Sequence, residues 1–274
     1  PGEDPFLTSM YALDFVNGLQ GSHEILKTIA TPKHFVGHFF EGEGSDPWGN
    51  GTQVLRYAND TIYSLQDLEQ YYLPPFRAAL RDAESVMCAY QSVNGVPMCA
   101  NGFLLNRVLR DTWKWDGFVV SDCDAIDSMR LGYHGYSLTG EMAVQDGVKA
   151  GCDSNCGKIY FDFGRKALEM GLISKEELDT SVRRLLRPLF RLGLFDSPDQ
   201  DPYGHLGWEH VNTDKHKELS LEGSRQGIVL LQNGVNSNVL PLSTNSSQVI
   251  LVAGPMYNAT VDMLGNYNGP VCDG

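Results

Sequence analysis

The segment Gly117-Phe118-Val119-Val120-Ser121-Asp122 (residues 117–122) decides the fold. Its apolar run has the length of a buried strand and ends in a carboxylate, and a helical pattern follows over residues 137–150. Apolar runs of strand length also occur at residues 27–35, 85–90 and 151–154, and helical patterns lie between them. Repeated strand–helix units with apolar strands are typical of a parallel sheet covered by helices. The sequence therefore predicts an α/β fold.

Helices are predicted where apolar residues recur every three to four positions. Asn101 is a candidate N-cap, and Ser174 and Glu177 have the spacing of a capping box. Pro188 lies inside the last of these helices, so a kink or break near Arg187 is expected. Besides residues 137–150, the predicted helices span residues 7–19, 64–81, 101–113, 158–170 and 174–192.

The predicted strands share polar residues at their ends, namely Lys33 with His34, then Tyr90, Asp122 and Asp153. In a (β/α)8 barrel the carboxyl ends of the strands form the catalytic face. A closed barrel needs eight strands, and this sequence offers four convincing ones. We therefore expect residues 1–195 to be the C-terminal part of a (β/α)8 TIM-like barrel whose first strands lie outside this chain.

A second domain is predicted beyond a linker. Residues 196–213 are rich in Asp, Pro and Gly, which is typical of a linker. A helical pattern follows from Asp214 to Arg225, and apolar runs at residues 228–231 and 249–252 read as strands. We expect residues 214–274 to be the beginning of a second α/β sandwich domain, incomplete in this chain.

Charge and composition exclude several classes of function. The chain has 274 residues, a net charge of −13 and a pI of about 4.9, so a nucleic-acid partner is not expected. No apolar run is long enough for a membrane span. Four glycosylation sequons begin at Asn50, Asn59, Asn245 and Asn258 and favour a secreted, extracellular protein. No signal peptide is visible at the start, so we expect the chain to begin inside a longer polypeptide.

The strand ends carry side chains suited to sugar chemistry. A carboxylate such as Asp122 can attack an anomeric carbon, although it could equally cap a following helix. Lys33 and His34 can donate hydrogen bonds to sugar hydroxyls, although a lysine stem lying over the core with its amine in water is the simpler alternative. Tyr90 could contact either the nucleophile or the substrate, although a buried tyrosine is common in any core.

A metal-hydrolase interpretation rests on His34 and His38, which are four residues apart, with Glu41 and Glu43 nearby. This spacing forms a metal site only on a helix. Here the pair follows a predicted strand and is interrupted by Gly37. We therefore expect neither a metal nor a cofactor.

The ordered series of motifs resembles glycoside hydrolase family 3 along nearly the whole chain. Lys33-His34-Phe35 resembles the sugar-binding pair of the family, residues 87–96 resemble the strand with its site tyrosine, and residues 117–122 resemble its nucleophile motif. Further resemblances are Pro1-Gly2-Glu3-Asp4-Pro5 to the loop after a substrate-binding arginine, Gly193-Leu194-Phe195-Asp196 to the end of the barrel, and Val229-Leu230-Leu231-Gln232-Asn233 with Leu240-Pro241-Leu242 to the entry of the second domain.

The resemblance implies a retaining glycosidase with Asp122 as nucleophile and with Lys33, His34, Met87 and Tyr90 binding substrate. The family usually supplies its acid/base glutamate from the second domain, beyond this chain. The resemblance thus implies that the remaining barrel strands and second domain of the same polypeptide are partners of this chain. We expect the chain alone to be inactive.

Within the family, Cys123 favours the β-xylosidase branch, because β-glucosidases usually have tryptophan after the nucleophile. The resemblance implies hydrolysis of xylo-oligosaccharides, releasing β-D-xylose from non-reducing ends. A bridge from Cys123 to Cys156, or to Cys152, would fill the space that the hydroxymethyl group of a glucoside needs. Cys88 and Cys99 could form a second disulfide. A family 3 β-glucosidase and a non-catalytic sugar-binding chain are the alternatives.

Overall fold

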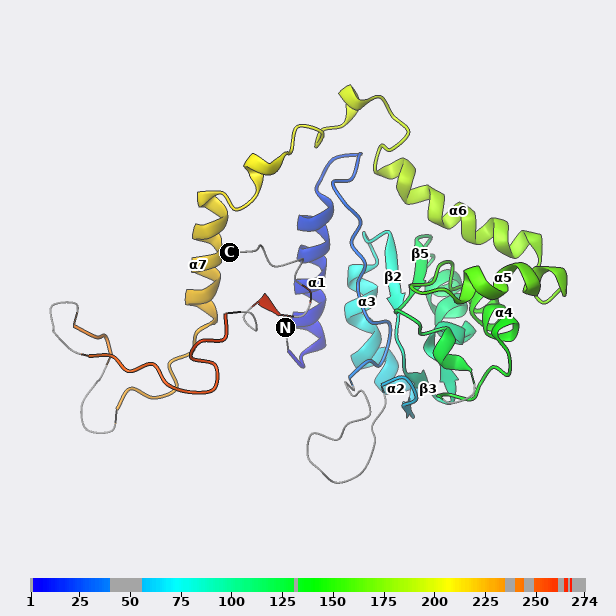
Figure 1. The fold of residues 1–274 in the computed structure, drawn as a ribbon, viewed down its shortest axis with the longest axis horizontal. Coiled ribbons are helices and arrows are strands. Elements are labelled where there is room, and N and C mark those ends of the chain that lie inside the picture. Colours follow the sequence, from blue (N-terminus) through cyan, green and yellow to red (C-terminus); the bar gives the residue numbers. More distant parts are fainter. Residues whose placement is uncertain are drawn as a thin grey trace. The chain divides into compact units, whose positions relative to one another are not determined.

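The computed structural model describes residues 2–39, 56–130, 133–234, 240–243, 249–260, 264–265 and 267. The chain forms two units, Pro1–Leu206 and Gly207–Gly274. The first unit contains α1 (Pro5–Gln20), β1 (Asp60–Thr61), α2 (Leu65–Asp67), η1 (Leu68–Tyr72), α3 (Leu73–Ala79), β2 (Ser85–Cys88), β3 (Ser92–Val93), β4 (Val96–Pro97), η2 (Met98–Ala100), η3 (Phe103–Thr112), β5 (Phe118–Ser121), η4 (Asp127–Met129), α4 (Gly140–Ala150), α5 (Ile159–Glu169), α6 (Lys175–Arg191) and η5 (Pro198–Gln200). The second contains η6 (Trp208–His210) and α7 (Asp214–Gly227) (Figure 1).

A parallel arrangement of four chain segments organises the first unit. β2 and β5 pair in parallel, with Ser85 opposite Phe118 and Cys88 opposite Ser121. On one side, Phe35 forms a parallel bridge with Cys88, and on the other Val120 forms a parallel bridge with Ser154. The four segments therefore follow one another in chain order, as the predicted α/β fold requires.

The two outer segments are shorter than predicted. Residues 27–34 are not a strand, and only Phe35 makes a bridge, supported by hydrogen bonds from Phe35 N to Met87 O (2.7 Å) and from Ala89 N to Phe35 O (2.8 Å). The segment at residues 151–154 likewise makes a bridge and no strand. A strand extends only over residues whose backbone groups form hydrogen bonds with a neighbouring strand. Among the described residues, each outer segment pairs with one neighbour.

Helices cover this arrangement where the sequence predicts them. α1 packs against α3, and α4 packs against α5 and α6 (Figure 1). Asn101 directly precedes Gly102, which is the N-cap of η3, and its Oδ1 accepts a hydrogen bond from Leu104 N in the first turn at 3.1 Å. The capping box of Ser174 and Glu177 begins α6. The core lies between these helices and the strands, where Val86, Leu105, Val119, Ile126 and Met129 are fully buried.

The predicted break near Arg187 does not occur, because α6 continues through Pro188 to Arg191. Ion pairs hold the helix on both sides of the proline. Arg184 pairs with Asp153 at 3.0 Å, and Arg191 pairs with Glu84. These tethers and the burial of Pro188 offset the hydrogen bond that the proline cannot donate.

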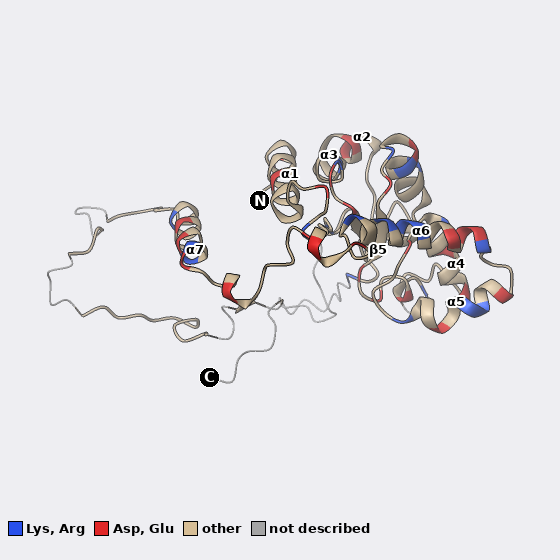
Figure 2. Ribbon diagram, turned by 90° about the horizontal axis from the view of Figure 1, so that it is seen from above, with Lys and Arg blue, Asp and Glu red and all other residues tan. Residues whose placement is uncertain are grey.

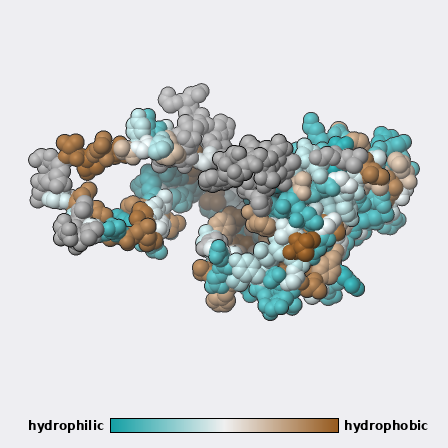
Figure 3. All heavy atoms as spheres, turned by 90° about the horizontal axis from the view of Figure 1, so that it is seen from below, coloured by the Kyte–Doolittle hydropathy of each residue, from teal (hydrophilic) through white to brown (hydrophobic). Residues whose placement is uncertain are grey.

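The second unit differs from the prediction in its strands. α7 confirms the predicted helix, and its N-cap Thr213 accepts a hydrogen bond from His216 N. Residues 228–231 and 249–252 are not strands, and their side chains are exposed, as for Leu231 (92%) and Val249 (96%). The exposed apolar residues of this unit form the brown surface at the left of Figure 3. Strands need hydrogen-bonded neighbours, and the described part of this unit provides none.

Candidate active site

The parallel register brings the carboxyl ends of three segments to one edge. Asp122 follows β5, and its backbone N–H donates to Cys88 O at 3.0 Å. Tyr90 follows β2 by two residues, and His34 directly precedes the bridge at Phe35. The predicted site residues Asp122, Tyr90 and His34 therefore meet, as expected for the catalytic edge of a parallel α/β sheet.

Asp122 is a buried carboxylate with three polar contacts. Its Oδ2 lies 3.3 Å from His34 Nε2, and its Oδ1 accepts a hydrogen bond from Cys123 N at 2.8 Å. The Tyr90 phenol also interacts with this carboxylate, whose charge contributes to the raised pKa of the phenol. The side chain does not cap a helix, since the next element is η4 with Ile126 at its N-cap position. The carboxylate is thus oriented by an imidazole, a phenol and a backbone N–H.

Tyr90 lies in an aromatic and cationic environment. Burial and the neighbouring Asp122 charge raise the pKa of the phenol far above its usual range, so the group remains a hydrogen-bond donor. Its ring packs edge-on against Tyr57 at 4.9 Å between centroids, and the Arg56 guanidinium lies 5.2 Å from its ring centroid. Arg56 and Tyr57 were not expected from the sequence, because they follow a Gly-rich stretch and belong to no predicted element.

Lys33, His34 and His38 line a cavity of about 600 Å³ beside α1 and α3. Lys33 is exposed, and the His34 and His38 rings are 4.2 Å apart. Asp122 and Tyr90 do not line this cavity, and His34 borders both the cavity and Asp122. The predicted role of Lys33 in substrate binding stays a prediction.

Met87 is half-buried on β2, between the fully buried Val86 and Cys88. It lies opposite Val120 of β5 in the parallel register. Because side chains alternate along a strand, Met87 faces the side of the sheet opposite to Cys88. None of the contacts of Asp122 described above involves Met87, and its predicted role in substrate binding stays a prediction.

The geometry does not favour the metal site. His34 and His38 are not on a helix, and Glu41 and Glu43 lie outside the described residues. Within the described ranges, the one group of possible ligands consists of Cys88, Cys99 and Cys152, and the first two form a disulfide.

Both predicted disulfides are present. Cys123 pairs with Cys156, directly beside Asp122, and Cys88 pairs with Cys99. Cys152 keeps a buried free thiol. The backbone supports the first bridge, because Asp124 N donates to Cys156 O at 2.7 Å and Cys156 N donates to Ser121 Oγ at 3.1 Å. The end of β5 is therefore fixed to the segment after residue 154.

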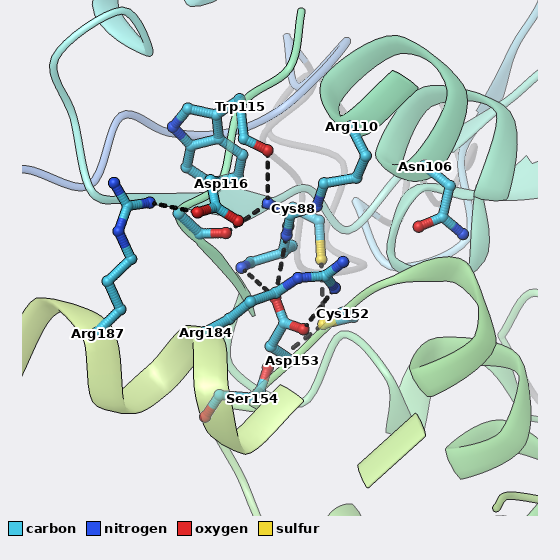
Figure 4. Close-up of polar contacts among 12 residues, drawn as sticks. Cys88, Asn106, Arg110, Trp115, Asp116, Cys152, Asp153, Ser154, Arg184 and Arg187 are labelled. Carbon is cyan, nitrogen blue, oxygen red and sulfur yellow. Dashed lines mark hydrogen bonds and ion pairs between the residues drawn. The ribbon is translucent and has the colours of Figure 1, made fainter. Parts of the chain in front are cut away.

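Asp153 does not join the site, so the expectation that every strand-end residue lies on the catalytic edge is wrong. Its carboxylate is fully buried and pairs with Arg110 of η3 and Arg184 of α6 (Figure 4). The side chain therefore faces the helices that cover the sheet. Sequence position at a strand end does not give the side to which a side chain points.

The four sequons divide between described and undescribed residues. Asn50 and Asn245 lie outside the described residues. Asn258 is exposed, and Asn59 is half-buried, with its amide donating to Thr61 Oγ1 at 3.0 Å.

Among the described residues, no helix combines the length and the apolar character that crossing a bilayer requires.

Known proteins resemble this chain in sequence. Residues 2–188 match the family described as Glycosyl hydrolase family 3 N terminal domain. A probable exo-1,4-beta-xylosidase bxlB of Aspergillus terreus is 41% identical over 98% of this chain and 34% of its own length. A beta-xylosidase/alpha-L-arabinofuranosidase 2 of Medicago sativa subsp. varia is 41% identical over 99% of this chain and 35% of its own. The chain thus spans about a third of the length of these curated relatives.

Solved structures agree with this match. A GH3 exo-beta-xylosidase (XlnD), in complex with a xylobiose aziridine activity-based probe, is 39% identical with a TM-score of 0.79 and covers 89% of this chain and 31% of its own. A beta-glucosidase from Listeria innocua in complex with glucose is 30% identical with a TM-score of 0.72 and covers 88% and 32%. This chain belongs to glycoside hydrolase family 3.

Proposed function

We propose that this protein is a retaining β-glycosidase that releases β-D-xylose from the non-reducing ends of xylo-oligosaccharides, with Asp122 as nucleophile. One observation carries the proposal. A buried carboxylate at the end of β5 is held by His34 and Tyr90 in a chain that belongs to glycoside hydrolase family 3. Curated relatives with about 40% identity are named exo-1,4-beta-xylosidases, which supports this substrate class.

In the proposed reaction, a carboxylate oxygen of Asp122 attacks the anomeric carbon while the bond to the leaving oxygen breaks. A second carboxyl group, about 5–5.5 Å away in retaining enzymes, protonates that oxygen and then activates water. Water then cleaves the glycosyl ester and restores Asp122. The Tyr90 phenol and His34 orient the carboxylate, and we propose that Lys33 and Met87 bind the sugar.

We further propose that the four parallel segments are an arc of a (β/α)8 barrel and that residues 214–274 begin a second α/β sandwich domain. The arc is supported by the chain order of the segments and by their parallel bridges. In such a barrel the carboxyl ends of the strands surround the substrate. Asp122, Tyr90 and His34 lie at those ends.

The Cys123–Cys156 disulfide supports xylose over glucose. It lies directly beside Asp122, and we propose that it fills the space that the hydroxymethyl group of glucose would need. Xylose lacks this group. A family 3 β-glucosidase is the second candidate, because the Listeria innocua structure in complex with glucose shares the fold at 30% identity. Hydrolysis of matched aryl β-xylosides and β-glucosides separates the two.

Secretion is part of the same proposal. The disulfides at Cys88–Cys99 and Cys123–Cys156 are typical of oxidising compartments. The exposed Asn258 is accessible to glycosylation. Glycosidase treatment of the secreted protein, followed by measurement of its mass, tests glycan occupancy at Asn50, Asn59, Asn245 and Asn258.

The test of the nucleophile is covalent labelling with 2,4-dinitrophenyl 2-deoxy-2-fluoro-β-xyloside. The dinitrophenolate leaves without protonation, so the reagent tests Asp122 without requiring the acid/base residue. The experiment uses this chain and the product of its complete reading frame, with peptide mass spectrometry. Asp124→Asn is the matched control, because Asp124 is two residues away and the carboxylate that pairs with His34 is that of Asp122.

We expect an adduct on Asp122, its persistence in Asp124→Asn and its loss in Asp122→Asn. If the adduct forms on another residue while aryl xyloside is hydrolysed, that residue and not Asp122 is the nucleophile. No adduct and no hydrolysis by the complete product would favour a non-catalytic sugar-binding protein.

A further inference from the structure

A buried cluster of three charged side chains lies behind the site. The Asp153 carboxylate is 0% exposed, with Oδ2 3.1 Å from Arg110 Nη2 and Oδ1 3.0 Å from Arg184 Nη1 (Figure 4). Arg110 comes from η3 and Arg184 from α6, the helix whose arginines form the blue band in Figure 2. The cluster therefore joins two helices to the segment beside β5.

The same carboxylate holds the backbone of β5. Val119 N donates to Asp153 Oδ2 at 2.9 Å, and Asp153 N donates back to Val119 O at 2.8 Å. Arg110 adds a hydrogen bond to Trp115 O at 3.1 Å and another to Gly117 O, both just before β5. Asp122 follows Val119 by three residues. The position of Asp122 along the sheet therefore depends on these contacts.

Burial makes the cluster sensitive to the charge of Asp153. It lowers the pKa of Arg110 to about 10 and raises the pKa of Asp153. Arg110 therefore stays cationic at neutral pH. The Asp153 carboxylate pairs with the largely buried Arg110 and the partly exposed Arg184, and its neutralisation removes the counter-charge that both share.

We propose that Asp153 is a positioning residue that fixes β5 and thereby the place of Asp122 against the substrate. This inference rests on the proposed function of Asp122, because the consequence for substrate follows from its role as nucleophile. Glu84 provides a comparison. It is also a buried acid paired with an arginine of α6, Arg191, but its side chain is not hydrogen-bonded to β5.

The test compares Asp153→Asn with Glu84→Gln in the product of the complete reading frame. Two quantities are measured at a temperature where circular dichroism shows folded protein. One is the rate of labelling of Asp122 by the 2-fluoro-xyloside, separated into its maximal rate and the half-saturating concentration. The other is hydrogen exchange of the amides at residues 119–122, compared with those of α4.

We expect Asp153→Asn to lower the maximal labelling rate at least tenfold and to change the half-saturating concentration less than twofold. Exchange at residues 119–122 should rise at least tenfold, while α4 stays protected. Glu84→Gln should lower the melting temperature but leave both quantities within twofold of wild type. Asp153→Asn combined with Arg184→Gln should recover part of the melting temperature without recovering the labelling rate.

Unchanged exchange at residues 119–122 in Asp153→Asn would overturn the inference, as would an equal rise in Glu84→Gln. Faster exchange with an unchanged labelling rate would overturn it too. If the wild-type protein is not labelled, the proposed function fails. The exchange measurement then still decides whether Asp153 fixes β5.

Discussion

At the scale of single residues, a carboxylate serves as a nucleophile only when its orientation is fixed before the substrate arrives. Asp122 meets this requirement through three different groups: the His34 imidazole, the Tyr90 phenol and the Cys123 amide. The residue types of this set could be predicted from the ends of the apolar runs. The contribution of Arg56 could not, because it follows a Gly-rich stretch and belongs to no predicted element.

Removal of the Tyr90 hydroxyl should weaken catalysis more than binding. Tyr90→Phe keeps the ring but loses the interaction of the hydroxyl with the Asp122 carboxylate. If that interaction has the strength of a hydrogen bond to a charged group, about 1.5–3 kcal/mol, kcat/KM for an aryl xyloside should fall about 10- to 100-fold. Tyr57→Phe is the matched control, because the Tyr57 hydroxyl bonds Arg56 at 2.9 Å. Equal losses in both variants would contradict the role given to Tyr90.

His134 should make stability depend on pH. Its Nε2 lies 2.8 Å from Tyr90 O and its Nδ1 lies 3.0 Å from Ser92 Oγ. Burial, opposed by the Tyr90 carbonyl and by Asp60, lowers its pKa below the ordinary 6.5. Above that value both folded and unfolded states are neutral. As the pH falls below it, the unfolded state binds the proton first, so stability is lost.

The measurement is urea unfolding between pH 8 and pH 5 in wild type and His134→Gln. Wild type should lose up to about 1.4 kcal/mol per pH unit through this group as the pH falls below 6.5. The variant should lack this contribution, so the difference in unfolding free energy between the two should shrink toward pH 5. A constant difference across the range would show that His134 does not titrate differently on folding.

At the scale of elements, local sequence signals account for helices better than for strands. The capping box at Ser174 and the hydrogen bond from Leu104 N to Asn101 are each made by residues three apart, so the chain itself specifies them. The segment at residues 27–35 depends instead on β2, which lies about fifty residues later. The length over which this segment is a strand therefore depends on how many neighbouring segments pair with it. The pattern of apolar residues does not give that number.

The Cys123–Cys156 bridge joins two elements across a sequence separation of 33 residues. In the chain-entropy account, a loop of this length stabilises the folded state by about 3–4 kcal/mol. Cys123→Ser with Cys156→Ser should therefore lower the urea midpoint strongly. Cys152→Ala removes a buried free thiol and is the control, with an expected loss below about 1.5 kcal/mol.

The double variant Cys123→Ser with Cys156→Ser also tests the proposed preference for xylose. If the bridge excludes the hydroxymethyl group, its removal should raise the ratio of glucoside to xyloside hydrolysis. An unchanged ratio in a folded double variant would assign the preference to other residues.

At the scale of the whole molecule, the two units differ in how far local sequence specifies them. In the first unit, apolar runs become buried segments such as β2 and β5, because each finds a parallel neighbour. In the second, equally apolar runs at residues 228–231 and 249–252 remain exposed and irregular. Apolar character predicts that a segment will be buried if a partner is present. It does not supply the partner.

This contrast predicts the pattern of hydrogen exchange in the chain. The amides at residues 229–231 and 249–252 should exchange at the rate of an unstructured peptide, because backbone groups without partners are open to water. The amides at residues 85–88, paired with β5, should exchange at least a hundredfold more slowly. Both sets are read from peptides of one sample, so protection in β2 is the internal control. Protection at residues 249–252 equal to that of β2 would mean that these apolar runs form strands, as their sequence predicts, and that the second unit finds pairing partners in solution.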